Sequence, residues 1–218
     1  MEYAVTDLGL EVELEAGELK DSWRHRVHLD WGRLPGSYGW VFPKDHTLTV
    51  GVIAERGRPD ETRAYLTGLV EGLGLDGLDV LEDSGHLTRC REDGSPLFRG
   101  RVLVAGDAAG LLEPWTREGI SFALRSGALA GSHAAALARG DRGAGAAYAA
   151  AVESDLGEEV RAGFACRAAF TRHPGVFHTL LSRTPVGWRS FLRIVSGDTT
   201  LERAMRHRTV RGALQLLR

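Results

Sequence analysis

An acidic residue directly after a short apolar run is the residue of this sequence best placed to bind a ligand. The run Arg101–Ala105 leads into Gly106 and Asp107, and its unbroken apolar character predicts a strand covered on both faces. A carboxylate at the carboxyl end of such a strand lies where open α/β sheets bind ligands. An ionised carboxylate accepts hydrogen bonds from sugar-type hydroxyls, and glycine permits close approach to the backbone. We therefore predict that Gly106 and Asp107 bind a polyhydroxyl group.

A second anion-binding feature follows within a few residues. A loop containing Pro114 leads to Gly119 and Ile120, where a helix is predicted to begin. The free N–H groups and the positive dipole end of a helix start favour an anion. The alternative is that Asp107 is only a helix N-cap and Gly119 only a turn residue. The combination of strand, Gly-Asp, proline loop and glycine-led helix favours the binding site.

Three aromatic residues alternate in a predicted strand near the N-terminus. Tyr38, Trp40 and Phe42 are separated by single residues, so all three side chains lie on one face of the strand. Such a row forms an apolar wall that suits a hydrophobic ligand in a concave pocket. The alternative is that the three rings fill the core beneath the sheet.

The run Gly106 to Gly110, with Pro114 and the Glu118–Ile120 segment, resembles the second flavin-binding motif of FAD-dependent reductases and hydroxylases of the p-hydroxybenzoate hydroxylase type. The resemblance implies that Asp107 holds the ribityl chain of FAD. It also implies that the helix begun by Gly119 and Ile120 points at the flavin pyrimidine ring, where negative charge collects on reduction.

The segment Pro35–Lys44 narrows the resemblance, because it is similar to the PxxYxWxFP signature of the geranylgeranyl reductase family. That family saturates carbon–carbon double bonds of isoprenoid chains on lipids, quinones or pigment precursors. The resemblance implies FAD as cofactor, NAD(P)H or another reductant as electron donor, and an isoprenoid lipid, quinone or prenyl diphosphate as substrate. Tyr38, Trp40 and Phe42 become candidate substrate-binding residues. The sequence identifies no catalytic proton donor.

The sequence departs from the family pattern in three places. Arg117 stands where the family usually has glycine, and Ile53 stands where a second glycine is expected after Gly51. No G-x-G-x-x-G turn for the FAD pyrophosphate precedes Tyr38. We therefore expect a truncated flavoenzyme, with a separate N-terminal nucleotide-binding half as one partner.

Two other functions stay open at this point. The Gly-Asp motif is shared with flavin monooxygenases and halogenases, which act through oxygen. A non-catalytic remnant that binds an isoprenoid or a partner chain is the third candidate, because the nucleotide half is missing.

Composition excludes several classes of protein. The 218 residues carry a net charge of −2 with 43% hydrophobic residues, which argues against a nucleic-acid-binding surface and against disorder. Cys90 and Cys166 lack metal or disulfide spacing, so no metal site is expected and a cytoplasmic location is favoured. The segment from Pro185 to Arg218 carries seven arginines and two acids. Peripheral contact with an anionic membrane is one interpretation of this charge, and a solvated helix face is the other.

The fold class expected is α+β, an α/β flavoprotein fragment. It combines an antiparallel substrate-domain sheet, a buried strand leading into the Gly-Asp motif and a helical C-terminal region. Alternating apolar residues predict strands over 8–14, 23–31, 38–42 and 48–52. Helical patterns cover 59–73, 120–139, 144–172, 186–195 and 199–217. The expected divisions are a substrate-binding sheet domain (1–98), the C-terminal part of an FAD-binding domain (99–140) and a helical region (141–218).

Overall fold

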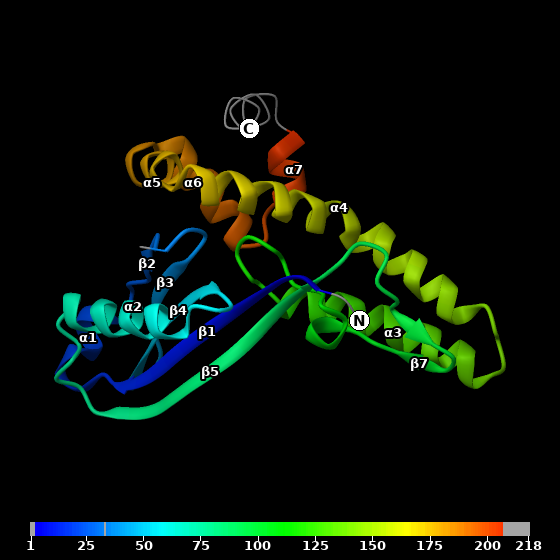
Figure 1. Cartoon of the computed structure of the whole chain (residues 1–218), viewed down its shortest axis with the longest axis horizontal. Coiled ribbons are helices and arrows are strands. Elements are labelled where there is room, and N and C mark those ends of the chain that lie inside the picture. The colour runs from blue at the N-terminus through cyan, green and yellow to red at the C-terminus, as the bar shows by residue number, and fades with distance from the viewer. Residues whose placement is uncertain (1–2, 33, 207–218) are drawn as a thin grey trace. The chain divides into compact units, whose positions relative to one another are not determined.

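The computed structural model describes residues 3–32 and 34–206 and divides into two compact units (Figure 1). Residues 6–87 form one unit, called here the sheet unit. Residues 3–5 and 88–206 are the described part of the other, called here the helical unit. The mixed composition confirms the predicted α+β class. The three predicted domain divisions remain a prediction.

The sheet unit is built on one five-stranded sheet whose order is β2-β3-β4-β1-β5. Its strands are β1 (Tyr3–Glu15), β2 (His28–Asp30), β3 (Tyr38–Pro43), β4 (Thr47–Glu55) and β5 (Val80–Arg91). Strands β3 and β4 form the predicted antiparallel hairpin, with Tyr38 opposite Ile53 and Trp40 opposite Gly51. The pairing of β1 with β4 is also antiparallel and places Glu11 opposite Gly51.

One face of this sheet is the core of the unit. Helix α2 (Pro59–Gly72) packs on it and buries Tyr65, Leu66 and Leu69 together with strand residues of the same parity. The strand residues in this cluster are Leu10, Val12, Leu14, Val41, Leu48, Val50 and Val52. Pro59 begins the helix and two acids follow in its first turn, as the dipole favours. The period-two pattern therefore directs every second side chain of β1, β3 and β4 into one core.

The helical unit is organised around two long neighbouring helices, α3 (Ile120–Ala138) and α4 (Ala144–Arg172), which lie side by side (Figure 1). Phe122 of α3 and Tyr148 of α4 are almost fully buried in their shared core. The Tyr148 hydroxyl donates to the carbonyl oxygen of Val104 at 2.7 Å. This bond ties α4 to the segment that carries the Gly-Asp motif.

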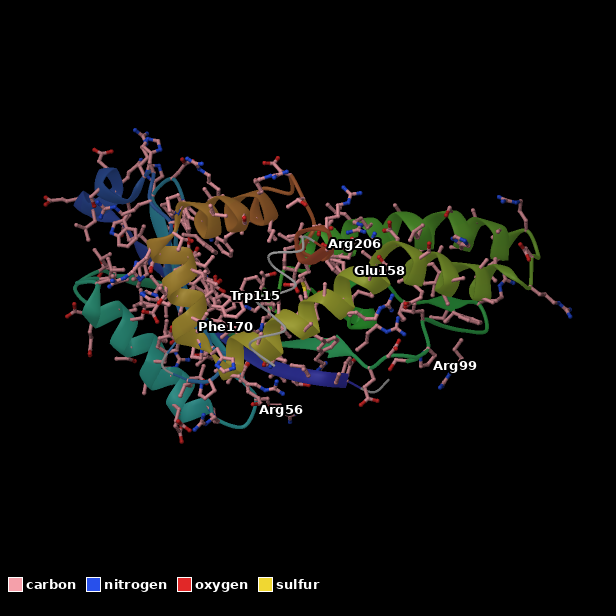
Figure 2. All side chains as sticks on the ribbon, turned by 90° about the horizontal axis from the view of Figure 1, so that it is seen from above. Arg56, Arg99, Trp115, Glu158, Phe170 and Arg206 are labelled. Atoms are coloured by element: carbon pink, nitrogen blue, oxygen red, sulfur yellow. The ribbon has the colours of Figure 1, made fainter. Side chains whose placement is uncertain are left out.

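Three shorter helices complete the described chain. They are α5 (Pro174–Arg183), α6 (Pro185–Val195) and α7 (Leu201–Arg206). Trp115, from the loop before α3, packs against three phenylalanines of α4, α5 and α6, and Figure 2 shows it beside Phe170. The other two rings are Phe177 and Phe191, with centroids 5.6 and 6.3 Å from the indole. The predicted helix over 199–217 extends in part beyond the described residues.

Two sequence predictions are wrong in detail. The strand predicted over 23–31 shortens to β2, because Lys20–Trp23 form the short helix α1, preceded by a 3-10 helix (η1) over Gly17–Leu19. Trp23 is buried against the sheet core, so its hydrophobicity comes from that packing and not from strand alternation.

The second correction concerns the apolar run before Gly106. Only β7 (Val102–Leu103) is a strand; it pairs with β6 (Phe98–Arg99), and Val102 is 64% exposed. A strand is covered on both faces only when neighbouring strands and helices flank it. Among the described residues, no strand other than β6 pairs with β7. Over the same part of the chain, no helix is both long and apolar enough to cross a membrane.

Candidate functional site

The Gly-Asp segment turns sharply out of extended backbone. Ala105 is extended, Gly106 has a φ of 52°, and residues Gly106–Ala109 form a 3-10 turn (η2). The amide of Gly106 donates to the Ser126 hydroxyl at 3.0 Å, and a Cβ at position 106 would lie 3.0 Å from the Ala123 side chain. Both the positive φ and the close approach of α3 require glycine here.

The loop between η2 and α3 is held by Glu113. Its carboxylate accepts hydrogen bonds from the amide of Trp115 at 3.1 Å and from the amide and hydroxyl of Thr116 at 2.5 Å each. The amide of Glu113 donates to the Glu118 carbonyl at 2.9 Å. Burial raises the pKa of Glu113, while these hydrogen bonds and nearby Arg117 oppose the rise. Glu113 is a loop-shaping residue that sequence reasoning missed.

The start of α3 lies against the carboxylate of Asp107. Gly119 caps the helix, and a Cβ added there would lie 3.1 Å from Asp107 Oδ1 and 2.9 Å from Leu112 Cδ1. A larger residue at position 119 would therefore push the carboxylate and the helix start apart. Glu118 accepts the amide of Ser121 at 2.7 Å, so one of the first helical N–H groups already has a partner.

These elements enclose one pocket of about 540 Å³ within the helical unit. Its lining residues are Thr88, Ala105, Gly106, Asp107, Leu112, Arg117, Gly119, Ile120 and Ala123. Four of the five predicted cofactor residues are among them. Pro114 is not; it packs on α4, where a Cβ at Gly163 would clash with its ring.

Two pocket residues have polar side chains that were not predicted as ligands. Thr88, near the end of β5, has a buried hydroxyl with no hydrogen-bond partner among the described residues. A buried hydroxyl without a partner is costly, and a polar ligand in the pocket would satisfy it. Arg117 is 8% exposed. The pocket therefore combines a carboxylate, a guanidinium, an orphaned hydroxyl and a helix start with apolar side chains, a donor set that fits the polar rim and ribityl chain of a flavin.

The tight packing of Gly163 on this loop yields a stability prediction. A Cβ at that position would clash with Glu113 Oε1 as well as with Pro114. We expect Gly163→Val to destabilise the fold by about 1–3 kcal/mol, the usual cost of overpacking a buried contact. Chemical unfolding measures this loss. Gly175→Val is the control, because a Cβ there meets nothing, and equal stability of the two variants would contradict the packing.

The raised pKa of Glu113 predicts how stability depends on pH. Between the ordinary value of 4.5 and the raised folded value, the folded state binds more protons than the unfolded state. The free energy of unfolding therefore falls as pH rises through that window, and it recovers as pH falls back towards 4.5. In Glu113→Gln this contribution is expected to be absent. Thermal unfolding of both proteins from about pH 4 to about pH 8 measures the difference, and parallel profiles would contradict it.

The predicted aromatic row lies on the sheet face opposite α2. Ring centroids of Tyr38 and Trp40 are 5.7 Å apart, and those of Trp40 and Phe42 are 6.2 Å apart. Phe42 is 42% exposed, whereas Val41 on the other face is fully buried. The indole of Trp40 lies so close over Gly51 that a Cβ there would clash with it. The rings therefore form a surface wall on the sheet and do not fill the core.

Comparison with known sequences identifies reductases as relatives. No family model matches the chain. The digeranylgeranylglycerophospholipid reductase of Methanocaldococcus jannaschii is 32% identical over 128 residues, covering 56% of this chain and 32% of that protein. The geranylgeranyl diphosphate reductase of Rhodobacter capsulatus is 32% identical over 126 residues, covering 54% of this chain and 30% of that protein. The match thus spans about a third of the length of these curated relatives.

Solved structures share the fold at lower identity. A geranylgeranyl bacteriochlorophyll reductase-like protein from Thermoplasma acidophilum has a TM-score of 0.68 at 19% identity, over 77% of this chain and 44% of that one. The flavin-dependent brominase Bmp2 has a TM-score of 0.62 at 15% identity, over 90% of this chain and 51% of that one.

The fold and the pocket define this chain as part of a flavoprotein of the FAD-dependent oxidoreductase class. Within that class, its curated relatives are digeranylgeranylglycerophospholipid and geranylgeranyl reductases. The resemblance to the geranylgeranyl reductase family, predicted from the two sequence motifs, is confirmed.

Proposed function

We propose that this chain supplies the substrate-binding sheet and the second flavin-binding segment of an FAD-dependent reductase that saturates carbon–carbon double bonds of an isoprenoid chain. The observation that carries the proposal is the placement of Asp107 and the start of α3 on one pocket. Bound FAD would supply hydride chemistry, and the protein would supply binding, orientation and exclusion of water.

Each part of the pocket has a role in this proposal. Asp107 would accept hydrogen bonds from the ribityl hydroxyls. The first turn of α3, opened by Gly119 and Ile120, would place its positive dipole end against the flavin ring. The Thr88 hydroxyl would donate to a flavin carbonyl or accept from a ring N–H. Glu113 would keep the loop in the shape that leaves the pocket open.

The aromatic row supports the choice of an isoprenoid substrate. Tyr38, Trp40 and Phe42 offer a continuous apolar surface without a charge of their own, which suits a prenyl lipid, quinone or prenyl diphosphate tail. NAD(P)H or another reductant would act as electron donor. The names of the relatives, which are reductases of geranylgeranyl compounds, also favour this substrate class.

A nucleotide-binding half would be the partner of this chain. Ile120 and Leu124 on α3 are 77% and 70% exposed, and a Cβ at Gly127 or Gly131 would meet nothing. A helix face with exposed apolar side chains and small residues is suited to close packing against a second protein surface. We propose that this face receives the half that binds the FAD pyrophosphate.

Reduction of a prenyl substrate tests the proposed function. The chain, alone and together with a nucleotide-binding half, is incubated anaerobically with FAD, reductant and geranylgeranyl phospholipid. The expected product is heavier by two mass units for each double bond reduced. Unchanged lipid in the presence of a bound, reducible flavin would overturn the reductase function.

A flavin monooxygenase or halogenase is the second candidate. The similarity to the brominase covers 90% of this chain, more than the similarity to the reductase-like protein. Oxygen separates the two functions, because a monooxygenase couples NAD(P)H consumption to a hydroxylated product and a halogenase to a halogenated one. Saturation of the lipid without oxygen would exclude both. A chain that binds prenyl lipid and no flavin would instead be the non-catalytic remnant.

A further inference from the structure

Arg117 has a backbone conformation that its side chain does not favour. Its φ is 59°, and it is the one non-glycine residue with positive φ among residues 3–32 and 34–206. In this region the Cβ of an L-residue comes too close to a neighbouring carbonyl oxygen, so glycine is favoured. The conformation explains why the related family usually has glycine at this position. It does not explain why this chain has arginine.

The side chain of Arg117 is held at the pocket. It is 8% exposed and lines the pocket with Asp107 and Gly119. Its Nη1 donates to the carbonyl oxygen of Trp115 at 2.7 Å, which fixes the guanidinium within the loop. Trp115 is itself anchored by the aromatic cluster of α4, α5 and α6. The positive charge is therefore positioned by packed structure and does not extend into solvent.

We propose that Arg117 is a binding residue that selects the reduced, anionic form of the flavin at this site. The inference rests on the proposed function, since it assigns a role toward the flavin. A guanidinium and the positive end of α3 face the same pocket, so both favour a ligand whose charge becomes more negative. The carboxylates of Asp107 and Glu113 are the nearby negative groups, and they offset part of this field.

The position argues against a role in stability alone. Glycine at 117 would remove the backbone strain, so arginine would be a poor choice for folding. Strained residues persist where the surrounding structure holds them for a binding or catalytic purpose. Arg117→Gly is therefore expected to fold, with a melting temperature within about 3 °C of the original.

The test compares three variants of the full chain with the original. Arg117→Gly removes the charge and the strain, and Arg117→Lys keeps the charge. Arg142→Gly, at an exposed turn residue, is the matched control for loss of one charge. FAD affinity is measured by fluorescence titration, and the midpoint potential of the bound flavin is measured by anaerobic dye equilibration.

We expect Arg117→Gly to weaken binding of reduced FAD about tenfold more than binding of oxidised FAD. A tenfold change lowers the two-electron potential by about 30 mV. Arg117→Lys should retain at least half of the difference, and Arg142→Gly should match the original.

Three outcomes overturn the inference. If Arg117→Gly binds both redox forms as the original does, Arg117 does not select the reduced form, while the proposed function stands. If Arg117→Gly loses more than about 10 °C of melting temperature, the arginine is a structural brace of its loop. If the original chain binds FAD neither alone nor with a nucleotide-binding half, the inference and the proposed function fail together.

Discussion

Asp107→Ala is expected to abolish tight flavin binding by this chain. The carboxylate lies at the opening of α3 and in the pocket, where it would accept two ribityl hydroxyl hydrogen bonds. Hydrogen bonds to a charged group contribute about 1.5–3 kcal/mol each. Loss of one to two such bonds weakens FAD binding about 100-fold or more. Equilibrium titration of flavin fluorescence measures the loss.

Two further variants make this result specific. Asp107→Asn keeps the size of the side chain and removes its charge, and we expect an intermediate loss of affinity. Asp93→Ala removes an exposed carboxylate from the same unit and should bind FAD as the original does. Wild-type affinity in Asp107→Ala, with an unchanged fold, would contradict the flavin site.

Trp40→Ala is expected to produce the largest loss of prenyl-substrate binding. The indole is the central ring of the aromatic row and lies over Gly51. If a prenyl chain covers about 100 Å² of this ring, its removal costs about 2.5 kcal/mol at about 25 cal/mol/Å². The corresponding fall in affinity is about 70-fold. Binding of a geranylgeranyl lipid in detergent, followed by quenching of the remaining tryptophans, measures it.

The sheet should survive this substitution. Val41 and Val50, on the other face of the same strands, are fully buried and carry the core. Trp188→Ala is the matched control, since that tryptophan is 45% exposed and belongs to the helical unit. Equal prenyl affinity of the two variants would show that the aromatic row is not the substrate wall.

Much of the sheet unit could be predicted from alternation alone. Leu8, Leu10, Val12 and Leu14 alternate with polar residues and glycine, and the structure places three of the four in the buried core of β1. The turn between β3 and β4 follows from Pro43 and three polar residues. Trp23 misled the prediction because hydrophobic residues enter a core equally well from a helix turn as from a strand.

The candidate site was predictable only in part. Asp107, Gly106, Gly119 and Ile120 were identified because a recognisable motif carries them, and they line the pocket. Arg117 was noticed only as a departure from glycine, and its positive φ gives the reason for that glycine. Thr88 gave no signal, because a lone threonine in a strand is usually a surface residue. An acid three residues before Thr116 was the only hint of the loop held by Glu113.

The sequence by itself determined the order of strands and helices, the two motifs and which side of each strand carries the aromatic rings, because these follow from local spacing along one chain. Only the tertiary structure decided that the Asp107 carboxylate meets the start of α3, that the Arg117 guanidinium is buried at the same pocket and that the Thr88 hydroxyl is left without a partner among the described residues. The physical reason is that these contacts join residues distant along the chain. Their geometry depends on loop conformation and on packing between helices, which no local pattern encodes.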